Sequence, residues 1–183
     1  MLTPILLGHP RGIAQSLMQG VERRMSVSIR WLDHTAIAVH SIEAALPLYR
    51  DVLGGDPQEL SHSPEKGFST LTLRFPHGGG IELITPLGPS GFVHDFLARR
   101  GEGVHHITFL VNDLQAAVAE ARAAGVRVVD ENYDHPEWQE AFLSPRSANG
   151  TIIQLAQTNK DLEGRKALWP ADAYHIHEKA GES

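Results

Sequence analysis

One nine-residue stretch occurs twice in this chain and constrains its fold more than any other feature. Residues 31–39 read Trp-Leu-Asp-His-Thr-Ala-Ile-Ala-Val, and residues 103–111 read Gly-Val-His-His-Ile-Thr-Phe-Leu-Val. Each copy places a histidine, His34 or His106, at the head of an apolar run typical of a buried β-strand. The two histidines lie 72 residues apart, so we expect two related structural units.

The first copy reads as a strand, a helix and further strands. Ser41 is a favourable N-cap, apolar residues follow it at helical spacing, and Pro47 is expected to kink this helix or delay its start. Strict alternation later puts Leu71 on one face of a strand and Thr70 and Thr72 on the other. The expected elements are a strand over 31–39, a helix from Ser41 to Gly54, a loop over 56–67 and strands over 68–75 and 81–84.

The second copy repeats this order after a linker that carries a helix around Phe96. Its expected elements are a strand over 104–111, a helix between Asp113 and Gly125, and strands over 126–129, 140–143 and 151–156. Each half therefore reads βαβββ, an α+β pattern. Because neither sheet can bury its face alone, we expect the modules 31–86 and 103–157 to pair into one pseudo-twofold, barrel-like cavity with helices outside.

Composition bounds the class of protein. With 183 residues and 42% hydrophobic side chains, the chain can bury one core, and its formal charge of −6 without a basic block argues against a nucleic-acid partner. The absence of cysteine excludes disulfides and thiolate metal sites and fits a cytoplasmic protein. The early apolar run at residues 5–7 is broken by proline and glycine, so we expect no membrane span.

Two segments are expected to flank the domain of residues 31–157. The N-terminal extension, 1–30, has helical spacing between Ile13 and Val21, which indicates a short docking helix; alternatively, Met25 is the native start. The C-terminal tail, 158–183, is mostly polar and is expected to pack over a pocket or on a neighbouring subunit.

Four polar residues sit at equivalent places in the two halves. Glu82 follows His34 by 48 residues, and Gln154 follows His106 by the same step. Two imidazoles, a carboxylate and an amide oxygen suit one divalent ion (Co, Ni, Mn, Zn or Fe) with positions open for water or substrate. Separate solvated residues are the alternative, but the equal spacing favours a shared site. Because adjacent strand residues face opposite ways, His105 is expected to point away from His106.

Several motifs together resemble the vicinal oxygen chelate superfamily of glyoxalases, bleomycin resistance proteins and extradiol dioxygenases. They are His-x-Ala-x-Ala-Val from His34, Tyr-x-x-x-Leu-Gly from Tyr49, Ile-Glu-Leu-Ile-x-Pro from Ile81, Gly-Glu-Gly-Val-His-His-Ile from Gly101, and Gly-x-x-x-x-Leu from Gly150. Over about residues 31–157, the chain is most similar to the methylmalonyl-CoA epimerase-like members. The resemblance implies paired βαβββ modules, often a homodimer, and a divalent metal on His34, Glu82, His106 and Gln154.

The chain departs from the epimerase pattern at both proton-moving carboxylates. Gln154 stands where the pattern has one Glu, and Thr70 or Leu71 stands where it has the other, so the usual two-carboxylate route lacks both of its bases. The Gln154 carbonyl can still bind metal, but an amide cannot take a proton at neutral pH. In the second half, Glu140 lies on the equivalent strand, in register with Phe68, Thr70 or Leu71. We hypothesise that Glu140 is the general base, moved across the pseudo-twofold axis; a Glu exposed at a strand end is the alternative.

These features favour a homodimeric metalloenzyme that acts on a small molecule. Isomerisation or epimerisation of an oxo or acyl compound, acyl-CoA included, through an enolate is the leading expectation. A glyoxalase-type lyase, an extradiol-type dioxygenase and a metal-free binding or resistance protein are the alternatives. Substrate contacts are expected from Thr70 and Thr72 in the cavity, from Trp138 by stacking and from Arg146 by binding an anionic group.

Overall fold

The structure is a computed structural model that describes residues 26–76 and 78–160. The expected docking helix near the N-terminus and almost all of the expected C-terminal tail lie outside the described residues. Within these two ranges, no helix has the length and apolar character needed to cross a membrane.

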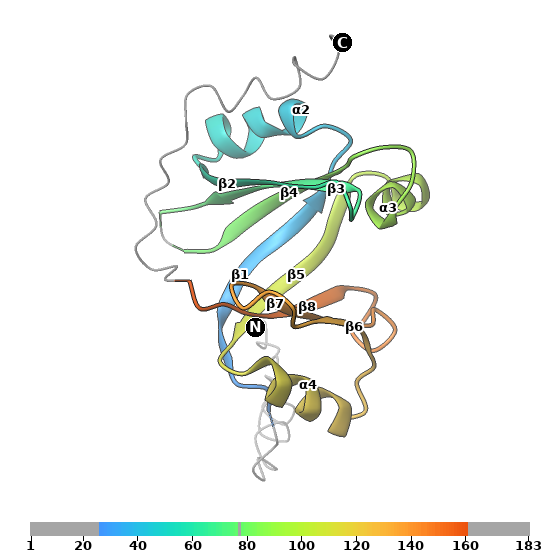
Figure 1. Ribbon diagram of the computed structural model, residues 1–183. Coiled ribbons are helices and arrows are strands. Elements are labelled where there is room, and N and C mark those ends of the chain that lie inside the picture. Colours follow the sequence, from blue (N-terminus) through green and yellow to red (C-terminus); the bar gives the residue numbers. More distant parts are fainter. Residues whose placement is uncertain (1–25, 77, 161–183) are drawn as a thin grey trace, which may run out of the picture.

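One mixed sheet of eight strands forms the centre of the molecule (Figure 1). The strands are β1 (Ile29–Ala38), β2 (Asp56–Ser63), β3 (Phe68–Arg74), β4 (Gly80–Pro86), β5 (Gly103–Val111), β6 (Val128–Asn132), β7 (Gln139–Leu143) and β8 (Ile152–Gln157). Their order across the sheet is β2-β3-β4-β1-β5-β8-β7-β6. The antiparallel strands β1 and β5 therefore join a first half, which carries β2, β3 and β4, to a second half, which carries β6, β7 and β8.

The 72-residue repeat is preserved in the strand pairing. In the first half Thr35 of β1 pairs with Ile81 of the parallel strand β4. In the second half Ile107 of β5 pairs with Ile153 of the parallel strand β8, so both partners are displaced by the same 72 residues. The expected pair of βαβββ modules about a pseudo-twofold axis is confirmed.

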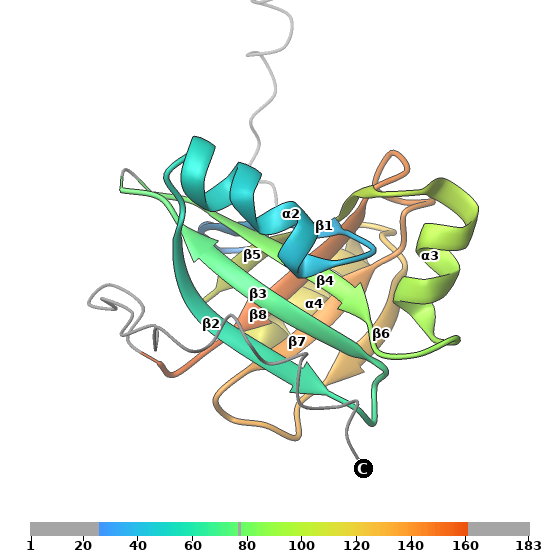
Figure 2. The same ribbon diagram turned by 90° about the horizontal axis from the view of Figure 1, so that it is seen from above.

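Helices cover the outer face of the sheet, and Figure 2 shows α2 lying over the strands of the first half. They are α2 (Ile42–Pro47), the π-helix η1 that continues it (Leu48–Val52) and α4 (Leu114–Ala123), whereas α3 (Phe92–Arg100) packs against the opposite face, on Ala38 and Ile84. Ser41 and Asp113 cap α2 and α4 as expected, accepting bonds from the N–H groups of Ala44 and Ala116. Pro47 does not delay the helix; instead the chain changes to the wider π-helical turn directly after it.

The apolar core lies between these helices and the outer face of the sheet. Leu71, Leu73 and Leu83 pack with Ile42 and Leu46 beneath α2. A second cluster, around Leu114, Val118, Ala141 and Leu155, lies beneath α4. Because alternate strand residues face opposite ways, this packing turns the polar residues between the apolar ones onto the inner face.

One strand has no clear signal in the sequence. Residues 56–67 were expected to form a loop, but residues Asp56–Ser63 form β2, an edge strand paired with β3. Pro57 is tolerated because an edge strand need not donate every backbone N–H. The inner face of β2 carries Glu59, Ser61 and Ser63, which line a polar cavity, so the apolar alternation that marks most strands is absent.

Candidate metal centre

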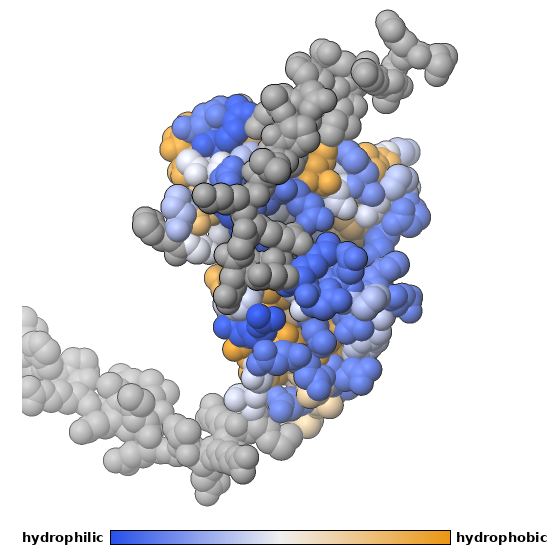
Figure 3. All heavy atoms as spheres, turned by 60° about the vertical axis from the view of Figure 1, so that its left-hand side comes forward, coloured by the Kyte–Doolittle hydropathy of each residue, from blue (hydrophilic) through white to orange (hydrophobic). Residues whose placement is uncertain are grey.

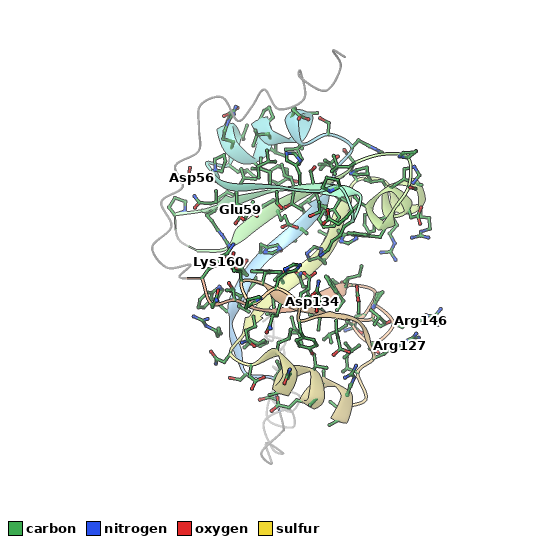
Figure 4. The ribbon with its side chains drawn as sticks, viewed as in Figure 1. Asp56, Glu59, Arg127, Asp134, Arg146 and Lys160 are labelled. Carbon is green, nitrogen blue, oxygen red and sulfur yellow. The ribbon has the colours of Figure 1, made fainter. Side chains whose placement is uncertain are left out.

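The inner face of the sheet encloses a cavity of about 1020 Å³ between the two halves. In Figure 4, Glu59 of the first half and Lys160 of the second lie on the side of the molecule where the halves separate, and both line the cavity. Where grey atoms do not cover it, the face drawn in Figure 3 carries mainly hydrophilic side chains. Most of the residues that line the cavity are polar or charged.

Three ligand-type side chains converge on this inner face. His34 of β1, Glu82 of β4 and His106 of β5 each offer one donor atom, and these atoms all lie within 4.8 Å of one another. His34 Nε2 lies 3.9 Å from Glu82 Oε2, and the two imidazole rings are 5.7 Å apart. Both histidines are buried. Strand pairing explains the convergence, because Glu82 pairs with Ala36, which in turn pairs with His106.

The expectation that His105 points away from His106 is wrong, because β5 contains a bulge. Ala36 pairs with His106 and Ile37 with Val104, which leaves His105 as an extra residue between them. The bulge breaks the alternation of faces, and His105 Nδ1 comes within 2.8 Å of His106 Nδ1.

The same irregularity occurs at the equivalent point of β1. Leu32 pairs with Phe109 and His34 with Thr108, so the extra residue is Asp33, which lies 72 residues before His105. The buried Asp33 carboxylate contacts His34 Nδ1 at 2.7 Å. Arg74 Nη2 donates to both carboxylate oxygens, at 3.0 and 2.9 Å.

The charges of these groups suit a bound cation. Burial opposes ionisation of Asp33, but hydrogen bonds from His34 and Arg74 and the charge of Arg74 hold its pKa at about 2. Burial, with the neighbouring His34 and His105, lowers the pKa of His106 well below its usual value, so this imidazole is neutral and can donate a lone pair. Burial raises the pKa of Glu82, and the carboxylates of Glu140 and Asp33 add to this. The two imidazoles and the partly buried carboxyl of Glu82 fit a divalent ion, which would supply the missing positive charge.

Gln154 lies beside this group and connects it to Glu140. Thr108 of β5 pairs with Gln154 of β8, and its hydroxyl donates to Gln154 Oε1 at 2.5 Å. The same hydroxyl lies 3.0 Å from His34 Nε2. At its other end, the Gln154 amide donates from Nε2 to Glu140 Oε2 at 2.7 Å. One buried amide therefore spans from the ligand group to a carboxylate of the second half.

Strand pairing gives Glu140 one of the three registers left open by the sequence. Glu140 pairs with Ala156, and the equivalent of Ala156 in the first half, Ile84, pairs with Thr70. Glu140 thus occupies the place of Thr70 across the pseudo-twofold axis and lines the cavity. Its Oε2 also accepts a hydrogen bond from Trp138 Nε1 at 3.2 Å, and Lys66 Nζ lies 3.6 Å from Oε1.

Three of the four expected substrate-contact residues are near this site. Thr70, Thr72 and Trp138 line the cavity. Arg146 does not: it is exposed, lies in the turn between β7 and β8, and appears in Figure 4 beside Arg127, well away from Lys160.

Five residues that the sequence did not single out contact the site without being ligand candidates themselves. They are Asp33, Lys66, Arg74, His105 and Thr108. The repeat carried one usable signal, since its offset places Asp33 on His105, a polar residue directly before the histidine in each copy.

Comparison with known proteins places this geometry in a family. The model of the Glyoxalase/Bleomycin resistance protein/Dioxygenase superfamily matches residues 33–142. The Uncharacterized protein YqjC of Bacillus subtilis is 34% identical over 134 residues, which cover 71% of this chain and 94% of that protein. The Ethylmalonyl-CoA/methylmalonyl-CoA epimerase of Cereibacter sphaeroides is 33% identical over 133 residues, which cover 69% and 96%.

A solved structure shares the fold. The Streptomyces coelicolor methylmalonyl-CoA epimerase, as a variant in complex with 2-nitronate-propionyl-CoA, matches with a TM-score of 0.65 and 29% identity. The match covers 72% of this chain and 96% of that one. The chain therefore belongs to the Glyoxalase/Bleomycin resistance protein/Dioxygenase superfamily, as one of its enzymes.

Proposed function

We propose that the protein is a divalent-metal-dependent isomerase or epimerase that moves a proton next to the carbonyl group of an acyl or oxo compound, with Glu140 as the general base. The observation that carries this proposal is the position of Glu140, a carboxylate that lines the cavity and is hydrogen-bonded to Gln154, which lies beside the ligand group. The superfamily and its epimerase relatives support the reaction class.

The metal ion would be held by His34, Glu82 and His106 and, through its amide oxygen, by Gln154. When bound, it would supply the positive charge that stabilises an enolate oxygen. The protein's own residues then have to orient the substrate and handle the proton.

The two oxygens of Glu140 have different surroundings, which indicates which of them takes the proton. Oε2 accepts hydrogen bonds from Gln154 and Trp138 and is fixed in place. Oε1 has the Lys66 ammonium at 3.6 Å, beyond hydrogen-bond distance, so its lone pairs remain available. A proton taken by Oε1 can be returned to a neighbouring atom by the same group. A single base of this kind favours isomerisation over a two-base epimerisation.

An acyl-CoA thioester is the first substrate class to test, because relatives are named as epimerases of such compounds. The lysine and arginine side chains that line the cavity, as far as the structure describes it, are all ion-paired. Arg74 pairs with Asp33, Lys66 with Glu140 and Lys160 with Glu137. We therefore propose that only the acyl end of such a substrate enters the cavity, with the phosphates of the CoA outside it.

Deuterium exchange tests the function directly. Metal-loaded protein is incubated with methylmalonyl-CoA in D₂O, and deuterium in the recovered thioester is measured by mass spectrometry, alongside elemental analysis of the protein. We expect stoichiometric metal and exchange in the wild type, and exchange slower by roughly 10²- to 10⁴-fold in Glu140→Gln with unchanged metal content.

The control for this substitution is Glu131→Gln. Glu131 lies on β6 and is bonded to Tyr133, and it is not among the residues that line the cavity, so this variant should exchange deuterium normally. Full exchange in Glu140→Gln would remove Glu140 from the mechanism. Stoichiometric iron with substrate-dependent oxygen uptake would instead establish a dioxygenase.

A further inference from the structure

The two imidazoles of the ligand group are held by neighbours that the strand pairing places in equivalent positions. Each neighbour is the extra residue of a bulge directly before the ligand histidine: Asp33 before His34, and His105 before His106. Each lies at hydrogen-bond distance from Nδ1 of that histidine, at 2.7 and 2.8 Å. With Nδ1 engaged, Nε2 is the nitrogen that would bind a cation on both rings, in place of the contact that His34 Nε2 makes with the Thr108 hydroxyl.

Asp33 is itself held in place by hydrogen bonds from neighbouring side chains. Arg74 donates to both of its carboxylate oxygens and, from Nη1, to its backbone carbonyl at 2.6 Å. Trp31 Nε1 adds a longer contact at 3.3 Å. Gly80 pairs with Arg74 and leaves room for its guanidinium group, because a Cβ at position 80 would lie 2.8 Å from Arg74 Nη1. Three elements thus converge on one buried carboxylate.

His105 is held in a different way, by aromatic packing. Its ring lies 5.5 Å from the ring of Phe92 and 4.9 Å from that of Phe96, both on α3. This helix belongs to the linker between the two halves, and Phe96 is half-buried against the core cluster of Val93 and Leu97. The linker helix therefore reaches the ligand group through His105.

We propose that Asp33 and His105 are positioning residues of the metal centre: a carboxylate partner orients His34, and an imidazole partner packed against α3 orients His106. The inference rests on the proposed function only in requiring that the site binds a metal ion. Outer partners of this kind commonly change metal affinity by about 10- to 100-fold when they are removed, because they fix the tautomer and orientation of the ligand.

Asp33→Asn tests the first half of the proposal, with the affinity of the full-length metal-free protein for Co²⁺ measured by titration calorimetry. We expect at least about tenfold weaker binding, with a shifted Co²⁺ absorption spectrum. Asp51→Asn is the matched control, since Asp51 also pairs with an arginine, Arg50, but is exposed and remote from the cavity. Equal losses in both variants, or no loss in Asp33→Asn, would overturn the role of Asp33.

His105 permits a comparison that does not depend on Asp33. His105→Leu keeps an apolar side chain among Phe92 and Phe96 but has no partner for His106 Nδ1, so we expect about tenfold weaker Co²⁺ binding. His105→Asn restores a hydrogen-bonding group near that nitrogen and should recover most of the affinity. If the two variants bind Co²⁺ equally well, His105 is only a packing residue. Thermal unfolding of each variant without metal separates lost folding from lost binding.

The experiment also separates this inference from the function on which it rests. Wild-type protein that binds none of the divalent ions proposed would overturn the proposed function itself. Wild-type binding that Asp33→Asn and His105→Leu leave unchanged would overturn only the positioning roles.

Discussion

The hydrogen bond between Gln154 and Glu140 has a direction that chemistry imposes. An ionised carboxylate can only accept, so the NH₂ group of Gln154 must face Glu140 and its oxygen must face Thr108. That oxygen consequently lies on the side of His34, whose Nε2 is 3.0 Å from the Thr108 hydroxyl. Glutamine at position 154 is therefore matched to glutamate at position 140, and the pair should be exchangeable only as a unit.

A swap of the two side chains tests this match. Gln154→Glu alone would place two carboxylates at the distance of a hydrogen bond, and we expect it to destabilise the metal-free protein by about 1 to 3 kcal/mol at pH 8. The double variant Glu140→Gln with Gln154→Glu restores the bond with its direction reversed and should recover most of this loss. Urea unfolding of the wild type, both single variants and the double variant measures the coupling. A double variant no more stable than Gln154→Glu would contradict it.

Burial of His105 makes the stability of the metal-free protein depend on pH. Burial lowers the pKa of His105 to about 4, against 6.5 in the unfolded chain. Between these values the unfolded chain takes up a proton that the folded protein does not, so stability falls as the pH drops, by at most about 1.4 kcal/mol per pH unit from this group. Asp33, whose pKa is about 2, stays ionised throughout this range.

Urea unfolding at pH 7 and pH 5 measures this dependence. His106, with its lowered pKa, acts in the same direction as His105, whereas Glu82, with its raised pKa, acts in the opposite one. Comparison of the wild type with His105→Asn isolates the contribution of His105, and the variant should lose less stability between the two pH values. An equal loss in both proteins would show that His105 does not titrate as its burial requires.

At the scale of elements, the contact between β3 and β4 decides whether Arg74 can reach Asp33. Alanine is normally preferred to glycine in a strand, so propensity alone predicts that Gly80→Ala stabilises the protein. The new Cβ would instead meet Arg74 Nη1 at 2.8 Å and the Asp33 carbonyl oxygen at 3.1 Å. We expect a net destabilisation of about 1 to 3 kcal/mol in urea unfolding.

A second background shows whether this effect passes through Arg74. In Arg74→Met the guanidinium is absent, so Gly80→Ala should then lower the free energy of unfolding clearly less than it does in the wild type. The same loss of stability in both backgrounds would trace it to the backbone carbonyls of Asp33 and Leu73 instead.

The elements differ in how far their sequence predicts them. The strands β1 and β5 were predictable because each is an apolar run that occurs twice. The edge strand β2 was not, because its inner face lines a polar cavity and carries no apolar alternation. Period-two reasoning assumes an uninterrupted ladder, so it could place His34 and His106 but could not foresee the bulges that bring Asp33 and His105 beside them.

The register of Glu140 could not be predicted from the sequence for a similar reason. The connections before β8 and before β4 differ in length, and a period of two residues cannot detect where the difference falls. Only the pairing of β7 with β8 assigns Glu140 to the place of Thr70. Arg146 does not line the cavity, and a turn residue carries no periodic signal that would indicate its direction.

At the scale of the whole molecule, the candidate site exists only when the two halves are paired. His34 and Glu82 come from the first half, and His106, Gln154 and Glu140 come from the second. The halves meet through β1 and β5 at the centre of the sheet, where both histidines lie. A cation bound between the halves therefore links them across the pseudo-twofold axis, and its binding free energy should add to the free energy of unfolding of the whole fold.

Thermal and urea unfolding with and without metal measure this stabilisation. At a Co²⁺ concentration 100 times the dissociation constant, we expect the wild type to gain about 2.7 kcal/mol, because only the folded chain brings the ligands together. His34→Ala and His106→Ala each remove one ligand from a different half, and each should abolish most of the gain. Since both halves supply ligands, a gain that survives either substitution would mean that Co²⁺ binds elsewhere. Asp51→Asn, remote from the cavity, should keep the full gain.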